Sequence, residues 1–276
     1  MAFDNSGPIS LIKYQALGND YLVLDLPGPL SQILRVLPVL CDRHFGLGSD
    51  GLLAFDPRTL SVRIFNPDGS EAEKSGNGLR ITACHAVLEH AAPQEFSLLT
   101  VGGGNAVRVL SRRRSEVVSE IDIGRPAFRE PGRTRIETPV GAVSAVLVSV
   151  GNPHCVVFDE PVTRSRCLEL GPALETHPMF PDRTNVQLVE ALGRDRARIE
   201  IWERGAGYTL ASGTSASAVA AALMREGLVD AAVTVEMPGG SLAVRQAEGG
   251  SLVQSGPARR VYRASIDVAD FREPRL

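Results

Sequence analysis

The chain has 276 residues, of which 43% are hydrophobic and 22% charged, as in ordinary globular proteins of one large or two small domains. The formal net charge is −3 and the one dense basic run is Arg112–Arg114, so nucleic acid is not an expected partner. No apolar run approaches the roughly 18 residues of a membrane span. The first ten residues contain an acid and no long apolar core, so we expect neither a membrane partner nor a secretory leader.

The cysteines and most histidines carry no recognisable motif. The four cysteines are Cys41, Cys84, Cys155 and Cys167, and they show no CxxC spacing and no companion histidine pattern. We expect buried free thiols in a cytoplasmic protein, with no disulfide and no metal site. Four histidines are interpreted as structural: His44, His85, His90 and His177.

The first half opens with the segment LIKYQALGNDYLVLDL, residues 11–26. Its alternating and β-branched residues predict two strands joined by a turn at Gly18 and Asn19. A further strand-like segment, SVRIFNPDG, covers residues 61–69 and precedes the turn SGNG that begins at Ser75. The apolar pattern LRITACHAVLEHA then predicts a helix over residues 79–91.

The second half repeats this order of signals. VSAVLVSVGNPHCVVFDE, residues 143–160, predicts two strands around a turn at Gly151 and Asn152. RARIEIWERG, residues 196–205, is strand-like and precedes the turn SGTS that begins at Ser212. SAVAAALMREG then predicts a helix over residues 217–227.

The two sets of signals are separated by about half the chain. Ser75 and Ser212 are 137 residues apart (212 − 75), and Gly18 and Gly151 are 133 apart (151 − 18). So long a period indicates a duplicated domain. We expect an α+β fold with mixed sheets, with domains at residues 1–123 and 124–261 and the strand at 262–276 as a candidate addition to the first. The Gly-, Pro- and Arg-rich residues 124–135 are interpreted as a linker or domain edge.

A serine before glycine at the start of a helix has two interpretations. Ser75 and Ser212 are typical helix N-caps, and spacing alone favours that role. The amides at a helix N-terminus also bind anions, so two such helix starts related by a pseudo-twofold axis could hold one carboxylate across a cleft. They would then stabilise the charge that develops when the neighbouring α-carbon loses a proton.

Several longer segments resemble the diaminopimelate epimerase family. NPDGSEAEKSGNGLR (residues 66–80) and ERGAGYTLASGTSASA (residues 203–218) are similar to its two active-site segments. Further matches follow in family order at residues 11–26, 40–53, 151–158 and 180–190, so the resemblance runs from about Leu11 to about Pro257. Several motifs in the right order are far more specific than one glycine motif.

The resemblance implies a fold and an activity. It implies two pseudo-symmetric domains, each a mixed sheet around a central helix, with the active site in the cleft between them. It also implies a cytoplasmic homodimer that needs no cofactor and acts on a small-molecule amino acid. Its reaction interconverts LL- and meso-diaminopimelate, in the lysine and peptidoglycan precursor pathway, by transfer of the α-proton between two cysteines.

The same resemblance assigns roles to residues of this chain. The two catalytic cysteines correspond to Ser75 and Ser212, and His154 and Glu203 correspond to the residues that tune them. The positions that correspond to substrate-binding residues are Asn19, Asn66, Gly76, Asn77, Asn152, Asn185, Arg204, Gly213 and Thr214, together with Tyr208 in place of a second glutamate. Gly51 stands where some members carry a binding glutamine.

Individually, several of these residues have simpler interpretations. Asn19 and Asn152 are also typical of left-handed turn positions, and Asn66 of the opening of a PDG turn. Arg204 could form a surface ion pair, and His154 could be a satisfied, partly buried histidine. Together, in family order, they favour an amino-acid pocket.

Serine at both cysteine positions is the main departure from the family. A free thiol has a pKa of about 8.5, whereas an alcohol lies nearer to water at about 15.7. At 1.36 kcal/mol per pKa unit, ionising serine costs roughly 10 kcal/mol more. Serine therefore needs an adjacent base to activate it.

Three alternatives follow from that departure. His154 or Glu203 could supply a base for tautomerase or lyase chemistry on another carboxylate substrate, with the serines assisting. The chain could be a non-catalytic amino-acid-binding module. The serines could also be engineered replacements, but Tyr208, Ser215 and Ser217 depart from the family segment too, which favours a natural serine variant.

Overall fold

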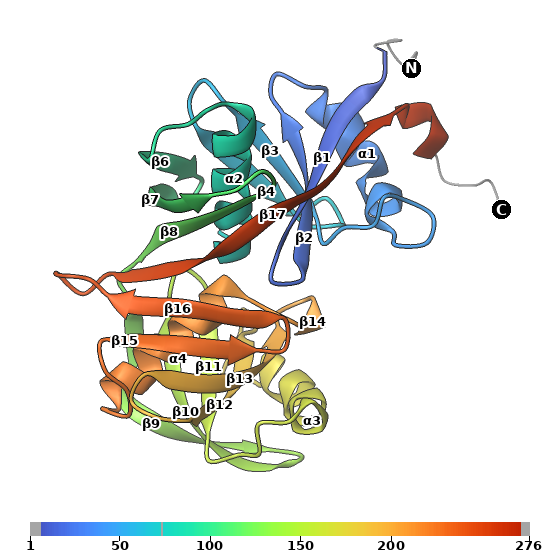
Figure 1. Ribbon diagram of the computed structural model, residues 1–276. Helices are drawn as coiled ribbons and strands as arrows, with labels where there is room; N and C mark the ends of the chain where they lie inside the picture. The colour runs from blue at the N-terminus through green and yellow to red at the C-terminus, as the bar shows by residue number, and fades with distance from the viewer. Residues whose placement is uncertain (1–6, 73, 272–276) are drawn as a thin grey trace. The chain divides into compact units, whose positions relative to one another are not determined.

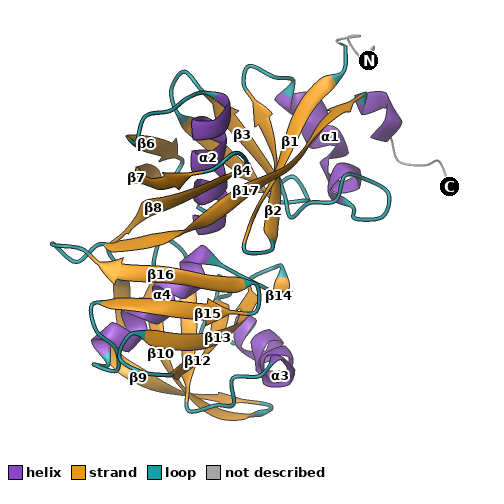
Figure 2. Cartoon of the chain, in the orientation of Figure 1, coloured by secondary structure: helices purple, strands orange, loops and turns teal. Residues whose placement is uncertain are grey.

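The computed structural model describes residues 7–72 and 74–271 (Figure 1). The first six residues, where we expected no secretory leader, and the end of the strand expected at 262–276 lie outside the described residues. Within the described ranges the chain forms 17 β-strands, four α-helices and one 3₁₀ helix (Figure 2). The fold is α+β with mixed parallel and antiparallel strands, as the sequence predicts.

The chain divides into two compact units. The first contains the residues up to Ala16, Asp20–Ser119 and the residues from Pro257, and the second contains Leu17–Asn19 and Glu120–Gly256. Two of the divisions fall inside strands, β8 (Glu116–Gly124) and β17 (Leu252–Ile266), and the others flank the turn at Leu17–Asn19.

Each half of the chain has the same order of ten elements. In the first half they are β1 (Ile9–Ala16), β2 (Asn19–Asp25), α1 (Leu30–Cys41), β3 (Leu52–Asp56), β4 (Ser61–Phe65), β5 (Glu71–Ala72), α2 (Gly76–Glu89), β6 (Glu95–Thr100), β7 (Gly103–Arg112) and β8. In the second half they are β10 (Gly141–Ser149), β11 (Pro153–Phe158), α3 (Arg164–Glu175), β12 (Asn185–Ala191), β13 (Arg196–Glu203), β14 (Gly207–Thr209), α4 (Gly213–Arg225), β15 (Ala232–Met237), β16 (Gly240–Gln246) and β17.

The strand pairing repeats as well. β2 pairs parallel with β3, and β4 pairs antiparallel with β3 and β5 and parallel with β6. The second half reproduces this, since β11 pairs parallel with β12, and β13 pairs antiparallel with β12 and β14 and parallel with β15. The duplication predicted from the two serine turns is therefore present in the fold.

The helices are of two kinds. In α2 every residue from Gly76 to Val87 is buried, and in α4 every residue from Gly213 to Leu223 is buried, as expected of a central helix surrounded by a sheet. α4 packs against β10, β11, β12, β15 and β16. By contrast, α1 and α3 bury one stripe each, α3 against β12, β13 and β14. The two serine turns thus begin the two central helices.

The interpretation of residues 124–135 as a linker is wrong. Most of this segment belongs to β9 (Ala127–Thr138), which pairs antiparallel with β10. The register shifts between Val146 and Val148, so the strand bulges there, and Gly132 in the bulge has φ +118°. A bulge accommodates a glycine that otherwise suggests a loop.

The thiols are as the sequence predicts. All four cysteines are buried and free. None of the helices in residues 7–72 and 74–271 combines the length and apolar character needed to span a membrane.

Candidate active site

The first serine turn is a helix cap. Ser75 is the N-cap of α2, with φ −141° and ψ 118°, and its Oγ accepts a hydrogen bond of 3.0 Å from the Gly78 amide. A Cβ on Gly78 would lie 3.1 Å from the Ser75 Cβ, so the glycine allows the serine to pack closely over the first turn. Ser75 is only partly buried.

The second serine turn has almost the same geometry. Ser212 is the N-cap of α4, with φ −144° and ψ 125°, and its Oγ accepts a hydrogen bond of 3.3 Å from the Ser215 amide. Its side chain also lies 3.3 Å from Thr214 Oγ1, and the residue is 3% exposed. The cap interpretation of both serines is therefore confirmed, and both hydroxyls stand at the positive end of a central helix.

His154 lies at the start of β11 and is held by Asn152. Its Nε2 is 2.9 Å from Asn152 Oδ1, so Nε2 carries the proton and donates to the amide oxygen. Its Nδ1 has no hydrogen-bond partner among the described residues. Burial lowers the pKa of His154 to about 3, so the imidazole is neutral at pH 7. The left-handed interpretation of Asn152 is wrong, because Gly151 carries the positive φ of this turn.

Asn185 connects two of the predicted segments. It begins β12 directly beside His154 in the parallel β11–β12 pair and is 4% exposed. Its Nδ2 donates to the Pro153 carbonyl at 2.8 Å, and its Oδ1 accepts from the Arg204 amide at 3.0 Å. One side chain thus joins the GNPH turn to the ERG turn.

Glu203 and Arg204 lie at the end of β13, on a turn that hydrogen bonds to Glu175 stabilise. The Glu175 carboxylate accepts from Trp202 Nε1 at 2.7 Å and from the Gly205 amide at 2.8 Å, and it pairs with Arg183 at 3.1 Å. The Arg204 side chain donates to a backbone carbonyl, that of Asp182, at 3.1 Å. Glu175 is a positioning residue that the sequence patterns did not identify.

Strand parity sorts the predicted residues onto two faces. Val186, Leu188 and Trp202 pack on the α3 face, so their neighbours Asn185, Gln187 and Glu203 project toward the α4 face. Gln187 confirms this, since its Nε2 donates to Ser215 Oγ of α4 at 3.0 Å. The α4 face therefore carries the polar residues His154, Asn185, Gln187 and Glu203.

Tyr208 lies on the opposite face from this group. It pairs with Trp202 across β13–β14 and packs against the α3 core cluster. Its hydroxyl donates to Glu200 Oε2 at 2.7 Å, and the Arg164 guanidinium lies 4.9 Å from its ring centre. Its location supports a packing role rather than the substrate contact expected from the resemblance.

The predicted residues around α2 divide into a turn and a helix start. Asn66 opens the PDG turn, with its amide bonded to the Ser70 carbonyl and its Nδ2 2.9 Å from Ser70 Oγ. Asn77 is 3% exposed, and its Oδ1 accepts from Arg80 Nη2 at 2.5 Å. Gly76 and Gly78 flank Asn77 in the buried first turn of the helix.

Asn19 belongs by its contacts to the second unit. The turn before it has positive φ at Leu17 and Gly18, not at Asn19, so the left-handed interpretation of Asn19 is wrong. The turn packs tightly, because a Cβ on Gly239 would lie 2.1 Å from the Leu17 carbonyl oxygen. Leu210, two residues before Ser212, accepts from the Gly239 amide at 2.8 Å. Close packing thus brings the Asn19 turn to the segment that leads into Ser212.

Arg80 is a second residue that the sequence patterns did not identify. It is 0% exposed, and its Nε and Nη1 have no hydrogen-bond partner among the described residues. Burial lowers the pKa of its guanidinium to about 9. An arginine within the otherwise apolar pattern that follows SGNG is the signal that could have identified it.

Gly51 explains one departure from the family pattern. Its φ is +154°, and a Cβ there would lie 2.2 Å from the Phe65 carbonyl oxygen. A glutamine cannot occupy this position without moving the backbone, so the local fold accounts for the glycine.

Solved structures share this architecture. A predicted epimerase from Pseudomonas aeruginosa superposes with a TM-score of 0.69 at 18% identity, covering 95% of this chain and 99% of that one. A hydroxyproline epimerase from Agrobacterium vitis gives a TM-score of 0.69 at 17% identity, covering 95% of this chain and 94% of that one. The chain therefore shares its fold with these two epimerases.

Sequence comparison identifies the family. Residues 11–128 and 146–261 match the family model described as diaminopimelate epimerase. Diaminopimelate epimerase 2 of Nostoc sp. is 41% identical, over 84% of this chain and 87% of its own length. The diaminopimelate epimerase of Synechocystis sp. is 35% identical over 94% and 99%. The chain belongs to the diaminopimelate epimerase family and is an isomerase of the epimerase type.

Proposed function

We propose that this isomerase transfers the α-proton of diaminopimelate, or of a closely related amino acid, without a cofactor. Support for the substrate comes from the relatives named diaminopimelate epimerase. The observation that carries the proposal is the repeated cap: Ser75 and Ser212 begin the two central helices with the same backbone conformation. We assign them the two proton-transfer positions.

The cap geometry favours an anionic oxygen. Each Oγ accepts a backbone N–H bond and stands at a helix N-terminus, and both effects stabilise a negative charge. Neither effect is large enough to offset the roughly 10 kcal/mol by which ionising an alcohol costs more than ionising a thiol. We therefore expect α-proton transfer by the serine pair to be slow, and replacement of both serines by cysteine to accelerate it.

The carboxylate and the distal amino-acid end need separate binding groups. We assign the reacting carboxylate to the first-turn residues Gly76, Asn77, Gly213 and Thr214, because helix N-termini bind anions. We assign the distal end to Glu203 and Arg204, whose turn is fixed by Asn185 and Glu175. Asn19, Asn66 and Asn152 are proposed as further polar contacts.

A binding module without turnover is the second candidate. The observation that favours it is the state of His154, which with a pKa of about 3 is too weak a base to activate a hydroxyl. The same observation disfavours lyase or tautomerase chemistry that depends on His154. A binding module would show a ligand-dependent rise in melting temperature with no α-proton exchange.

Proton NMR in heavy water separates the two candidates. LL- and meso-diaminopimelate are incubated with the native protein and with the Ser75→Cys, Ser212→Cys double variant. Loss of the α-proton signal with interconversion of the isomers in the native protein supports the proposed function. Melting-temperature shifts without exchange in either protein support the binding module.

A further inference from the structure

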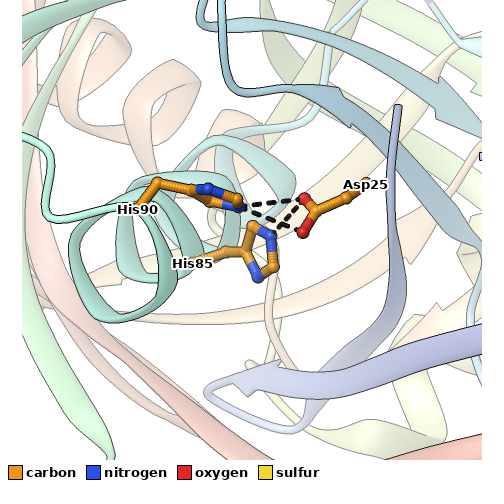
Figure 3. Close-up of side chains that lie close together, drawn as sticks. All are labelled: Asp25, His85 and His90. Carbon is orange, nitrogen blue, oxygen red and sulfur yellow. Dashed lines mark hydrogen bonds and ion pairs between the residues drawn. The ribbon is translucent and has the colours of Figure 1, made fainter. Parts of the chain in front are cut away.

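A second cluster of chemically capable side chains lies in the first unit, at the opposite end of α2 from Ser75. Asp25 is the last residue of β2, His85 lies near the C-terminal end of α2, and His90 is its C-cap. The carboxylate and the two imidazoles converge on one point (Figure 3). Their ligand-capable atoms all lie within 4.8 Å of one another. We call these three residues the Asp25 cluster.

The distances show that one carboxylate serves both rings. Asp25 Oδ1 is 2.7 Å from His85 Nε2 and 3.1 Å from His90 Nε2, and Asp25 Oδ2 is 3.0 Å from His90 Nε2. Two Nε2 atoms aimed at one carboxylate give two nitrogens and one oxygen, a donor set that zinc and related divalent ions prefer.

The rings are held in place by aromatic neighbours. His85 makes edge contacts with Tyr14 and Phe55, both with ring centres 5.5 Å away, and His90 lies 5.2 Å from His85. The His85 side chain is 1% exposed, whereas those of His90 and Asp25 are 27% and 42% exposed. The cluster is therefore buried at His85 and accessible at His90 and Asp25.

A hydrogen-bond relay fixes the second nitrogen of His85. Its Nδ1 is 3.0 Å from the Tyr14 hydroxyl, which lies 3.5 Å from Glu89 Oε1. The Tyr14 hydroxyl can donate to the Glu89 carboxylate and accept from Nδ1–H of His85. With an ion bound, Nδ1–H would donate to Tyr14 and Tyr14 would donate to Glu89, which would leave the Nε2 lone pair for the ion. Such outer-shell partners are typical of metal-binding histidines.

Two further features favour a cation at this place. The C-terminal end of α2 carries the negative end of the helix dipole, and the last turn of α2 holds no Lys or Arg. A pocket of about 640 Å³ opens beside the cluster and includes all three of its residues. A bound ion would thus have a solvent-accessible coordination position, as zinc sites with three protein ligands do.

We propose that Asp25, His85 and His90 form a binding site for a divalent transition-metal ion of the Zn²⁺ type, with the remaining coordination position open to the pocket. The site is independent of the proposed epimerase function. Without an ion, the two histidines would simply donate to Asp25 and Tyr14 would donate to His85. The experiment decides between these arrangements.

The test uses the full chain, stripped with a chelator and titrated with Co²⁺ and then with Zn²⁺. We expect one Co²⁺ per chain, a visible absorption band typical of four or five N/O ligands, and displacement by Zn²⁺. Zn²⁺ should also raise the melting temperature. His90→Ala, at a partly exposed position, should weaken binding by roughly tenfold or more, since even outer-shell changes cost 10–100-fold.

The controls keep the result interpretable. His44→Ala removes an exposed histidine outside the cluster and should bind as the native chain does. Asp25→Asn preserves side-chain volume and should lose the band, and Tyr14→Phe should weaken binding by roughly 10–100-fold. Circular dichroism verifies that each variant folds. Absence of stoichiometric Co²⁺ binding, or native binding by folded His90→Ala and Asp25→Asn, would overturn the proposal.

Discussion

Among single residues, Ser75 and Ser212 have both a structural role, as helix caps, and a proposed role in proton transfer. Each Oγ accepts an N–H bond at the start of a central helix, so each contributes to stability whatever its part in catalysis. His154 is a neutral imidazole held by Asn152, and Arg80 is a buried guanidinium held by Asn77. These are the residues whose protonation or loss has a measurable consequence.

The serine caps give a stability prediction. Ser212→Ala should lower the free energy of unfolding by about 1 kcal/mol, within the range of about 0.5–2 kcal/mol for lost caps, because the Ser215 amide loses its acceptor. The shift of the urea unfolding midpoint measures this. Ser165→Ala, at an exposed position inside α3, is the matched control and should move the midpoint much less. Equal shifts for both variants would contradict the capping role.

His154 gives a pH prediction. Its pKa is lowered from 6.5 to about 3 by burial, so between these values the unfolded chain binds a proton that the folded chain does not. The contribution of His154 to stability is therefore complete above pH 6.5 and is lost progressively as the pH falls toward 3. The neutral variant His154→Gln should lose less stability than the native chain between pH 7 and pH 4. Parallel pH profiles of unfolding free energy would rule this out.

At the scale of elements, α3 fixes the turn that follows β13. Gly171 allows close approach, since a Cβ there would lie 2.5 Å from Trp202 Cγ, and Glu175 bonds Trp202 and Gly205 on the other side of the turn. The Glu203–Arg204 segment is thus positioned by a helix that is distant in sequence. Its geometry depends on packing by α3 as well as on its own glycines, Gly205 and Gly207, which have φ +78°.

Glu175→Gln tests this positioning. Glutamine keeps the shape of the side chain, but its NH₂ group would face the N–H donors of Trp202, Gly205 or Arg183. We expect this to cost about 1–3 kcal/mol of stability. We also expect weaker binding of diaminopimelate, measured by calorimetry, because the Glu203–Arg204 turn loosens. Glu169→Gln on the exposed side of α3 removes a carboxylate of the same helix and should change neither quantity appreciably. Unchanged diaminopimelate affinity in folded Glu175→Gln would show that the hydrogen bonds of Glu175 to Trp202 and Gly205 do not contribute to ligand binding.

At the scale of the whole molecule, the duplication was predictable because its signals are local. The Gly-Asn turns, the alternating strands and the serine-capped central helices all follow from short patterns. α1 and α3 were not predicted, since Pro38 interrupts one pattern and Gly171 and Pro172 interrupt the other. The face on which Tyr208 lies was not predictable, because it depends on the register of β13 and β14. The contacts of Glu175 were not predictable either, because Trp202 is distant from it in sequence.

The most direct test of the central claim is α-proton exchange of LL- and meso-diaminopimelate in heavy water, followed by proton NMR. We predict slow exchange with interconversion of the isomers by the native chain, and much faster exchange by the Ser75→Cys, Ser212→Cys variant. Exchange by the double variant alone would contradict the role of the serines while leaving the pocket assigned. Exchange by neither, with both proteins folded, would contradict the assignment of an α-proton-transfer site altogether.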